Sequence, residues 1–152
     1  MQINTGESNA MSPSYLFLPM LVQVMLTMSV FIRLGAAKSK AASEGEVNEE
    51  RRALHDDAWP EPVIKLNNNI RNQFELPVLF YAVCFILWAL NTTNVFVHAV
   101  AWLFVISRIA HTIIHTGSNF VPLRRKVFTL GFLLLAGLVV IAFISVVTHG
   151  AA

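Results

Sequence analysis

The sequence predicts an all-α integral membrane protein, a bundle of four helices that each cross the bilayer. Three observations support this fold class. Hydrophobic residues make up 55% of the 152 residues and charged residues only 13%, which is not the composition of a soluble domain. Long uncharged runs recur along the chain, and a bilayer crossing needs about 20 largely apolar residues. The length fits a single domain over residues 1–152.

The first membrane helix is expected over about residues 13–34. Tyr15 to Ile32 is a run of 18 residues without charge, and Arg33 closes it. No basic segment precedes this run and no small-residue cleavage site follows it, so it does not resemble a secretory signal. We expect a short polar tail followed by a retained helix.

The second and third helices are expected over about residues 65–90 and 94–116. Leu76 to Ser107 is an uncharged run of 32 residues, too long for one crossing. Asn91-Thr92-Thr93-Asn94 interrupts this run, and Asn is a turn-forming residue. The run is therefore predicted to be a tight helical hairpin, with a local kink at Pro77.

The fourth helix is expected over about residues 124–148, and the orientation follows from the charges. Four antiparallel helices place a loop at about residues 35–64 and the 116–126 connection on one side, and both termini on the other. The basic residues outside the spans all fall on the first side: Lys38, Lys40, Arg51, Arg52, Lys65, Arg124, Arg125 and Lys126. The positive-inside rule then makes the two long loops cytoplasmic. The first loop mixes acids and bases and is expected to be solvated, with room for a short helix at Glu46–Leu54.

Two polar clusters interrupt the apolar runs, where an ionised side chain costs roughly 2.5–3.5 kcal/mol. The first contains Arg71, Asn72 and Glu75, and the second contains Arg108, His111 and His115. Spacings of three and four residues place each cluster on one helix face. At about 1.5 Å per residue, Glu75 and Arg108 lie at similar depth, roughly 21–24 Å from the hairpin turn. They are candidate ion-pair partners, and Arg124 and Arg125 begin the fourth helix at the same level.

These residues allow two interpretations. In the structural one, the charges neutralise one another and hold the bundle together. In the other, Arg71, Arg108 and Arg124 surround a partly hydrated pocket and bind the carboxylates of a small anionic ligand. No metal site is predicted, because no Cys, Asp or Glu stands beside the two histidines to complete a shell. A formal net charge of +2 is too small to indicate nucleic acid.

The order of these motifs resembles the MAPEG family, the membrane-associated proteins of eicosanoid and glutathione metabolism. The resemblance covers roughly residues 65–130. It rests on Arg71-Asn72-Gln73-Phe74-Glu75, then Arg108-Ile109-Ala110-His111-Thr112, then Pro122-Leu123-Arg124. It implies a homotrimer of four-helix subunits, in contact with membrane lipids, with glutathione bound between neighbouring subunits near the cytoplasmic face.

The resemblance also implies roles for individual residues. Arg124 matches the catalytic arginine that stabilises the glutathione thiolate. The expected glutathione-binding residues are Arg33, Arg71, Asn72, Glu75, Arg108, His111, His115 and Arg125. Three positions depart from the family pattern: His115 and Phe128 stand where the prostaglandin synthase branch has tyrosines, and Arg125 replaces a small hydroxyl residue.

The expected function is that of a glutathione-dependent membrane transferase or peroxidase, acting on lipophilic electrophiles or hydroperoxides that enter from the bilayer. The alternative is a non-catalytic MAPEG-fold scaffold or accessory subunit of a larger membrane complex, which the missing tyrosines favour. A bacterial inner membrane is favoured over the endoplasmic reticulum, because the chain ends Thr148-His149-Gly150-Ala151-Ala152 without a retention or sorting signal.

Overall fold

The computed structural model describes residues 12–149 and confirms the all-α fold class. Between these residues there is no β-strand. The helices are α1 Phe17–Ser43, α2 Glu61–Gln73, α3 Leu76–Ala89, α4 Val95–Thr116 and α5 Val121–His149, with short 3-10 helices at Pro13–Leu16 and Asp56–Ala58. The predicted polar tail at residues 1–11 lies outside the described residues.

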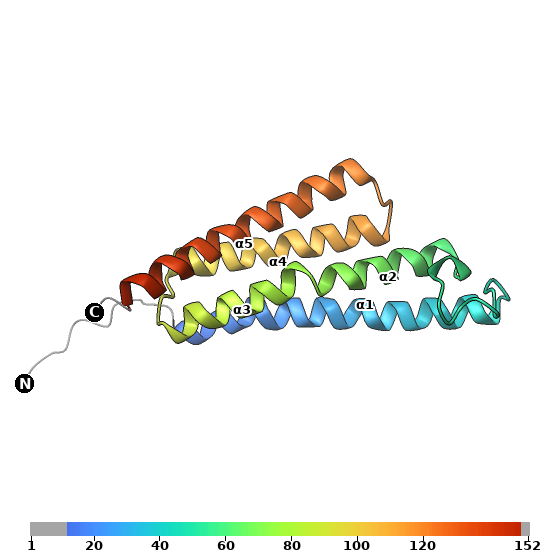
Figure 1. Ribbon diagram of the computed structural model, residues 1–152, viewed down its shortest axis with the longest axis horizontal. Coiled ribbons are helices and arrows are strands. Elements are labelled where there is room, and N and C mark those ends of the chain that lie inside the picture. The colour runs from blue at the N-terminus through green and yellow to red at the C-terminus, as the bar shows by residue number, and fades with distance from the viewer. Residues whose placement is uncertain (1–11, 150–152) are drawn as a thin grey trace, which may run out of the picture.

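The helices pack as an elongated antiparallel bundle (Figure 1). α2 and α3 follow one another along α1, while α4 and α5 form a hairpin whose arms diverge toward their connection. Four segments are long and apolar enough to cross a membrane: Pro13–Ser43, Glu61–Ala89, Val95–Thr116 and Val121–Thr148. The chain is therefore a multi-pass integral membrane protein, as predicted, with α2 and α3 forming one span.

α1 is longer than the sequence predicted, ending at Ser43 rather than near residue 34. Alanine-rich sequence beyond Arg33 favours continued helix, and the stop comes at Gly45, where φ is +71°. There the N–H of Glu46 donates to the carbonyl of Ala41, as expected of a glycine-terminated helix. At 27 residues, α1 measures about 40 Å and extends past a hydrocarbon core of about 30 Å.

The second predicted helix is broken rather than kinked. α2 ends at Gln73 and α3 begins at Leu76, which leaves Phe74 and Glu75 outside both helices. Pro77 explains the break: it has no N–H for a helical hydrogen bond, and its ring clashes with the carbonyl four residues earlier, that of Gln73. The polar cluster of this span therefore lies at a helix end, where backbone groups are free to bind other partners.

The loop between α1 and α2 contains turns at the position where the short helix Glu46–Leu54 was considered possible. The N–H of Asn48 donates to the carbonyl of Ala58 at 3.0 Å, which holds the start of this segment next to its end. A helix this short does not offset the cost of its first turn. An ion pair between Arg51 and Asp57 at 2.9 Å closes the loop further.

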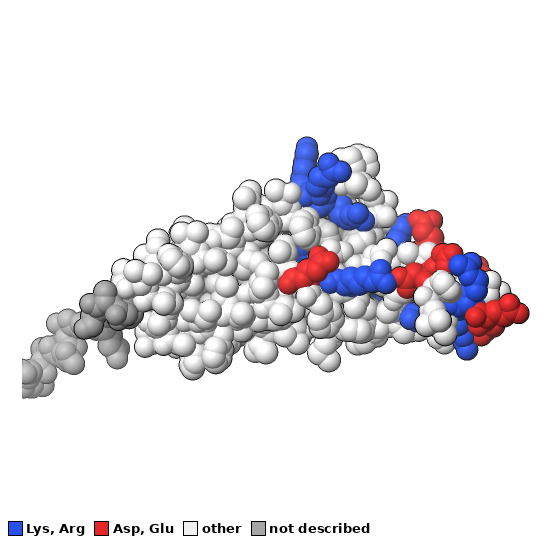
Figure 2. Space-filling view, viewed as in Figure 1, with Lys and Arg blue, Asp and Glu red and all other residues white. Residues whose placement is uncertain are grey.

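The apolar core lies among α3, α4 and α5. Phe80 stacks on Phe104 with ring centroids 4.3 Å apart. Gly131 lets α5 approach α4 closely, because a Cβ there would lie only 2.8 Å from the Ser107 hydroxyl oxygen. Charged side chains gather on the half of the molecule that carries the α1–α2 loop, and the other half is uncharged (Figure 2). This uncharged surface is the part of the molecule suited to lipid.

Candidate functional site

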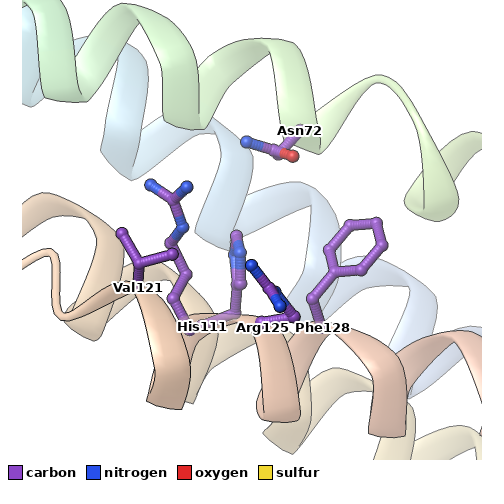
Figure 3. A pocket seen from close by; sticks show the side chains of 6 residues that line it. Asn72, His111, Val121, Arg125 and Phe128 are labelled. Atoms are coloured by element: carbon purple, nitrogen blue, oxygen red, sulfur yellow. The ribbon is translucent and has the colours of Figure 1, made fainter.

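A polar cavity of about 290 Å³ lies between α2, α4 and α5, near the lower end of the roughly 300–1,000 Å³ typical of small-molecule sites. It is lined by Asn72, His111, Val121, Arg124, Arg125 and Phe128. Figure 3 shows Asn72 on α2 across the cavity from the labelled side chains of α4 and α5. Four residues predicted from sequence to bind ligand, Asn72, His111, Arg124 and Arg125, thus meet around one space.

The cavity is basic, and its charge is not neutralised by its lining. Arg124 and Arg125 belong to the first turn of α5, which contains no acidic residue. A helix N-terminus itself carries about half a positive charge, so both cations oppose it. Arg124 Nη1 donates to the neutral amide oxygen of Asn119 at 2.6 Å. An anion in this space would offset the accumulated positive charge, as anions do at other helix N-termini.

Arg108 lies behind the cavity and is completely buried. Its Nη2 donates to the backbone carbonyl of Asn72 at 3.1 Å, and its guanidinium lies 5.6 Å from the ring centroid of Phe128. Its Nε and Nη1 have no hydrogen-bond partner in the described part of the chain. Buried donors without partners are costly, and Arg108 keeps two enclosed nitrogen atoms, Nε and Nη1, that lack the partners a buried guanidinium requires.

The anticipated direct ion pair between Arg108 and Glu75 is not among the ion pairs within residues 12–149. The helix break explains this difference. Leu76 starts a new helix, so it does not supply the hydrogen bond that the Asn72 carbonyl would receive inside a continuous helix, and Arg108 supplies it instead. Glu75 adopts a non-helical backbone conformation at the start of α3 and is exposed.

Arg71 and Arg33 do not line the cavity. Arg71 forms an ion pair with Asp56 of the α1–α2 loop, and its Nη1 donates to the side chain of Asn68 at 3.3 Å. Arg33 donates to the Thr116 hydroxyl at 3.1 Å and so joins α1 to the end of α4. Arg71, Asn72 and Glu75 do not share one face as predicted, because the break ends the helical periodicity before Glu75.

His115 is almost fully buried next to the cavity. Its Nδ1 lies 3.4 Å from Nδ2 of Asn69 and 3.5 Å from Nδ2 of Asn72. Its ring centroid is 5.4 Å from that of His111, which lines the cavity. His115 therefore contacts two lining residues without being one of them.

Sequence reasoning missed a buried amide network beside His115. Gln23 of α1 donates to the Gln73 side chain at 2.8 Å, and Gln73 donates to the Thr112 hydroxyl at 2.9 Å and to the Asn69 oxygen at 3.2 Å. Uncharged amides inside apolar spans were the available signal, because such groups seek hydrogen bonds between membrane helices. Among residues 12–149, no group of three His, Cys, Asp or Glu side chains could hold a metal ion.

A sequence model of the MAPEG family matches residues 16–144. The chain belongs to the MAPEG family. No curated protein and no solved structure matches it. Four crossing segments and the absence of strands within residues 12–149 agree with the four-helix membrane bundle of MAPEG proteins. Family members generally use glutathione as substrate or cofactor, and a basic cavity is the kind of site such an anionic peptide requires.

Proposed function

We propose that this MAPEG protein is a glutathione-dependent membrane transferase or peroxidase that acts on lipophilic electrophiles or hydroperoxides. The observation that carries the proposal is the basic cavity at the start of α5. It combines Arg124 and Arg125, which have no acidic neighbour in the lining, with the unpartnered donors of Arg108 behind them. Glutathione carries two carboxylates and a thiol, so its anionic groups match these donors.

Arg124 is the residue we propose to stabilise the thiolate. When bound, glutathione supplies the nucleophilic sulfur. The guanidinium of Arg124 is a cation, and a cation next to a thiol favours the reactive anion. Arg125 adds a second charge at the same helix terminus. Asn72, His111 and Arg108 would hold the peptide part, through an amide, an imidazole and a buried guanidinium.

The remaining predicted binding residues point to an assembly. Glu75, Arg71 and Arg33 lie outside the cavity of the single chain, and Glu75 is exposed at the helix break. Facing lipid, an ionised carboxylate would cost roughly 2.5–3.5 kcal/mol. Phe74 beside it is 57% exposed. We propose that a neighbouring subunit of a homotrimer covers this surface, and that these three residues reach glutathione at the subunit interface.

The proposed site opens on the cytoplasmic side of a bacterial inner membrane. The basic loop residues support this orientation through the positive-inside rule. With the buried native Cys84 replaced by alanine, a single cysteine placed in the α1–α2 loop by Ala53→Cys should react with a membrane-impermeant thiol reagent only when the cytoplasmic face is accessible. Labelling from the opposite face of intact cells would reverse the proposed orientation.

A non-catalytic scaffold or accessory subunit is the second candidate. Phe128 favours it, because this side chain lines the cavity with its ring 5.7 Å from that of His111 and has no hydroxyl to donate. A scaffold would retain the fold without binding glutathione. The two candidates therefore differ in whether the protein binds glutathione.

Calorimetric titration of glutathione into the detergent-purified assembly tests both candidates. We expect saturable binding and a thiolate ultraviolet absorbance that Arg124→Ala abolishes. Lys126→Ala is the matched control, since Lys126 lies on the same helix, is exposed and does not line the cavity. Full thiolate absorbance and turnover in Arg124→Ala would remove the catalytic role. Absence of binding at millimolar glutathione would instead support the scaffold.

A further inference from the structure

The buried amides beside the cavity form a chain of hydrogen bonds in which the NH₂ group of each amide donates to the oxygen of the next. The Gln23 amide donates to Gln73, and the Gln73 amide donates to the oxygen of Asn69. With its oxygen occupied as acceptor, Asn69 presents its NH₂ group to Nδ1 of His115, 3.4 Å away. All three amides are at most 2% exposed, so water does not compete for these groups.

Asn72 fixes the direction independently. An amide can in principle be turned over, which exchanges its donor and acceptor ends. The Asn72 NH₂ group lies 2.8 Å from the backbone carbonyl of Asn68, and a carbonyl can only accept. The orientation of Asn72 is therefore determined, and the same NH₂ group lies 3.5 Å from Nδ1 of His115.

Two NH₂ groups thus face one ring nitrogen of His115. A nitrogen that faces two donors has to be the bare acceptor, which leaves the proton of the neutral ring on Nε2. Within residues 12–149 Nε2 makes no hydrogen bond, yet it is not among the fully enclosed nitrogen atoms, unlike Nδ1 of His111. The Nε2–H group remains available to a ligand.

We propose that Asn69 and Gln73 are positioning residues, which hold His115 in the Nε2–H tautomer so that it acts as a hydrogen-bond donor toward bound ligand. Amides from α1 and α2 thereby determine which nitrogen of this imidazole carries the proton. This inference rests on the proposed glutathione site for its ligand, whereas the tautomer itself is a property of the free protein.

The first test is ¹⁵N nuclear magnetic resonance of the full-length protein with labelled histidine, without ligand. His115→Gln assigns the signal among the five histidines. We expect the Nε2–H pattern in the wild type, and a mixture of tautomers in Asn69→Leu and in Gln73→Leu. The positioning role would be overturned if the wild type showed an Nδ1–H pattern or a mixture of tautomers. It would also be overturned if both variants kept the tautomer pattern of the wild type.

The second test is glutathione affinity. Gln places an NH₂ group near the position of Nε2, so His115→Gln should bind glutathione within about threefold of wild type, whereas His115→Phe should bind about tenfold more weakly, as expected for one lost hydrogen bond. Equal affinity of His115→Phe and wild type would refute the donor role. If the wild type does not bind glutathione at all, the proposed function and the donor role both fail, while the tautomer result still decides the positioning role.

Discussion

Arg108 can be replaced by methionine to separate its structural role from its binding role. The side chain is completely buried, makes one hydrogen bond to the Asn72 carbonyl and leaves two nitrogen atoms, Nε and Nη1, without a partner. A hydrogen bond to a charged group contributes about 1.5–3 kcal/mol. If the free N–H groups bind glutathione, Arg108→Met should weaken affinity by about 10- to 150-fold.

The free energy of unfolding is subject to two opposing effects. The variant leaves the Asn72 carbonyl without a partner, which costs about 1–3 kcal/mol. It also removes a buried cation, and exchanging buried charge for an apolar side chain is often neutral or stabilising. The two effects oppose one another, so we expect the free energy of unfolding to move by no more than about 2 kcal/mol.

Calorimetry with glutathione and detergent-induced unfolding of the same preparations measure the two quantities. Arg52→Met is the matched control, because Arg52 is an exposed loop arginine paired with Glu49; its affinity should stay within about twofold of wild type. The reasoning is refuted if Arg108→Met unfolds more easily by over about 3 kcal/mol while glutathione affinity is unchanged. Arg108 would then be a structural residue of the bundle only.

Three further substitutions test other contacts. Asp56→Asn removes the carboxylate that pairs with Arg71 and so frees Arg71 for glutathione. Calorimetry should then show about threefold stronger glutathione binding, because a surface ion pair contributes under 1 kcal/mol. Weaker binding would show that the pair assists the site. Gly131→Ala places a methyl group against Ser107 and should lower unfolding free energy by about 1–3 kcal/mol, a result that unchanged thermal unfolding would contradict. Asn94→Ala removes the side-chain cap of α4, where Asn94 accepts from the N–H of Val97 at 3.0 Å; we expect a loss of about 1 kcal/mol, and no loss would mean that the cap is dispensable.

The crossing helices could be predicted from sequence because bilayer thickness dictates their length. Uncharged runs located all four spans, and the Asn91–Asn94 turn located the hairpin; α4 begins at Val95 and ends at Thr116, within one residue of expectation. Helix ends outside the membrane were less predictable. α1 continued to Ser43 since alanine-rich sequence and a glycine cap determine its end, and hydrophobicity carries no information about either.

The cavity was partly predictable. Asn72, His111, Arg124 and Arg125 come together because their depth in the membrane follows from counting along antiparallel helices. The position of the Arg71 side chain could not be predicted in this way. It depends on the ion pair with Asp56, a loop residue whose position does not follow from helical periodicity. The contact between Gln23 and Gln73 spans 50 positions. Gln73 belongs to the Arg71–Glu75 motif, but no pattern in the sequence pairs it with Gln23, so only the fold reveals the network.

The break between α2 and α3 has a consequence for how the protein assembles. In the membrane, helices insert first and associate afterwards. Because Leu76 begins α3 and does not donate to the Asn72 carbonyl, this end of α2 has no backbone partner within its own span. Arg108 of the third crossing supplies the missing donor, so the second crossing satisfies its Asn72 carbonyl only after α4 has docked against it. The cavity wall that contains Asn72 is thus completed by the association of the helices.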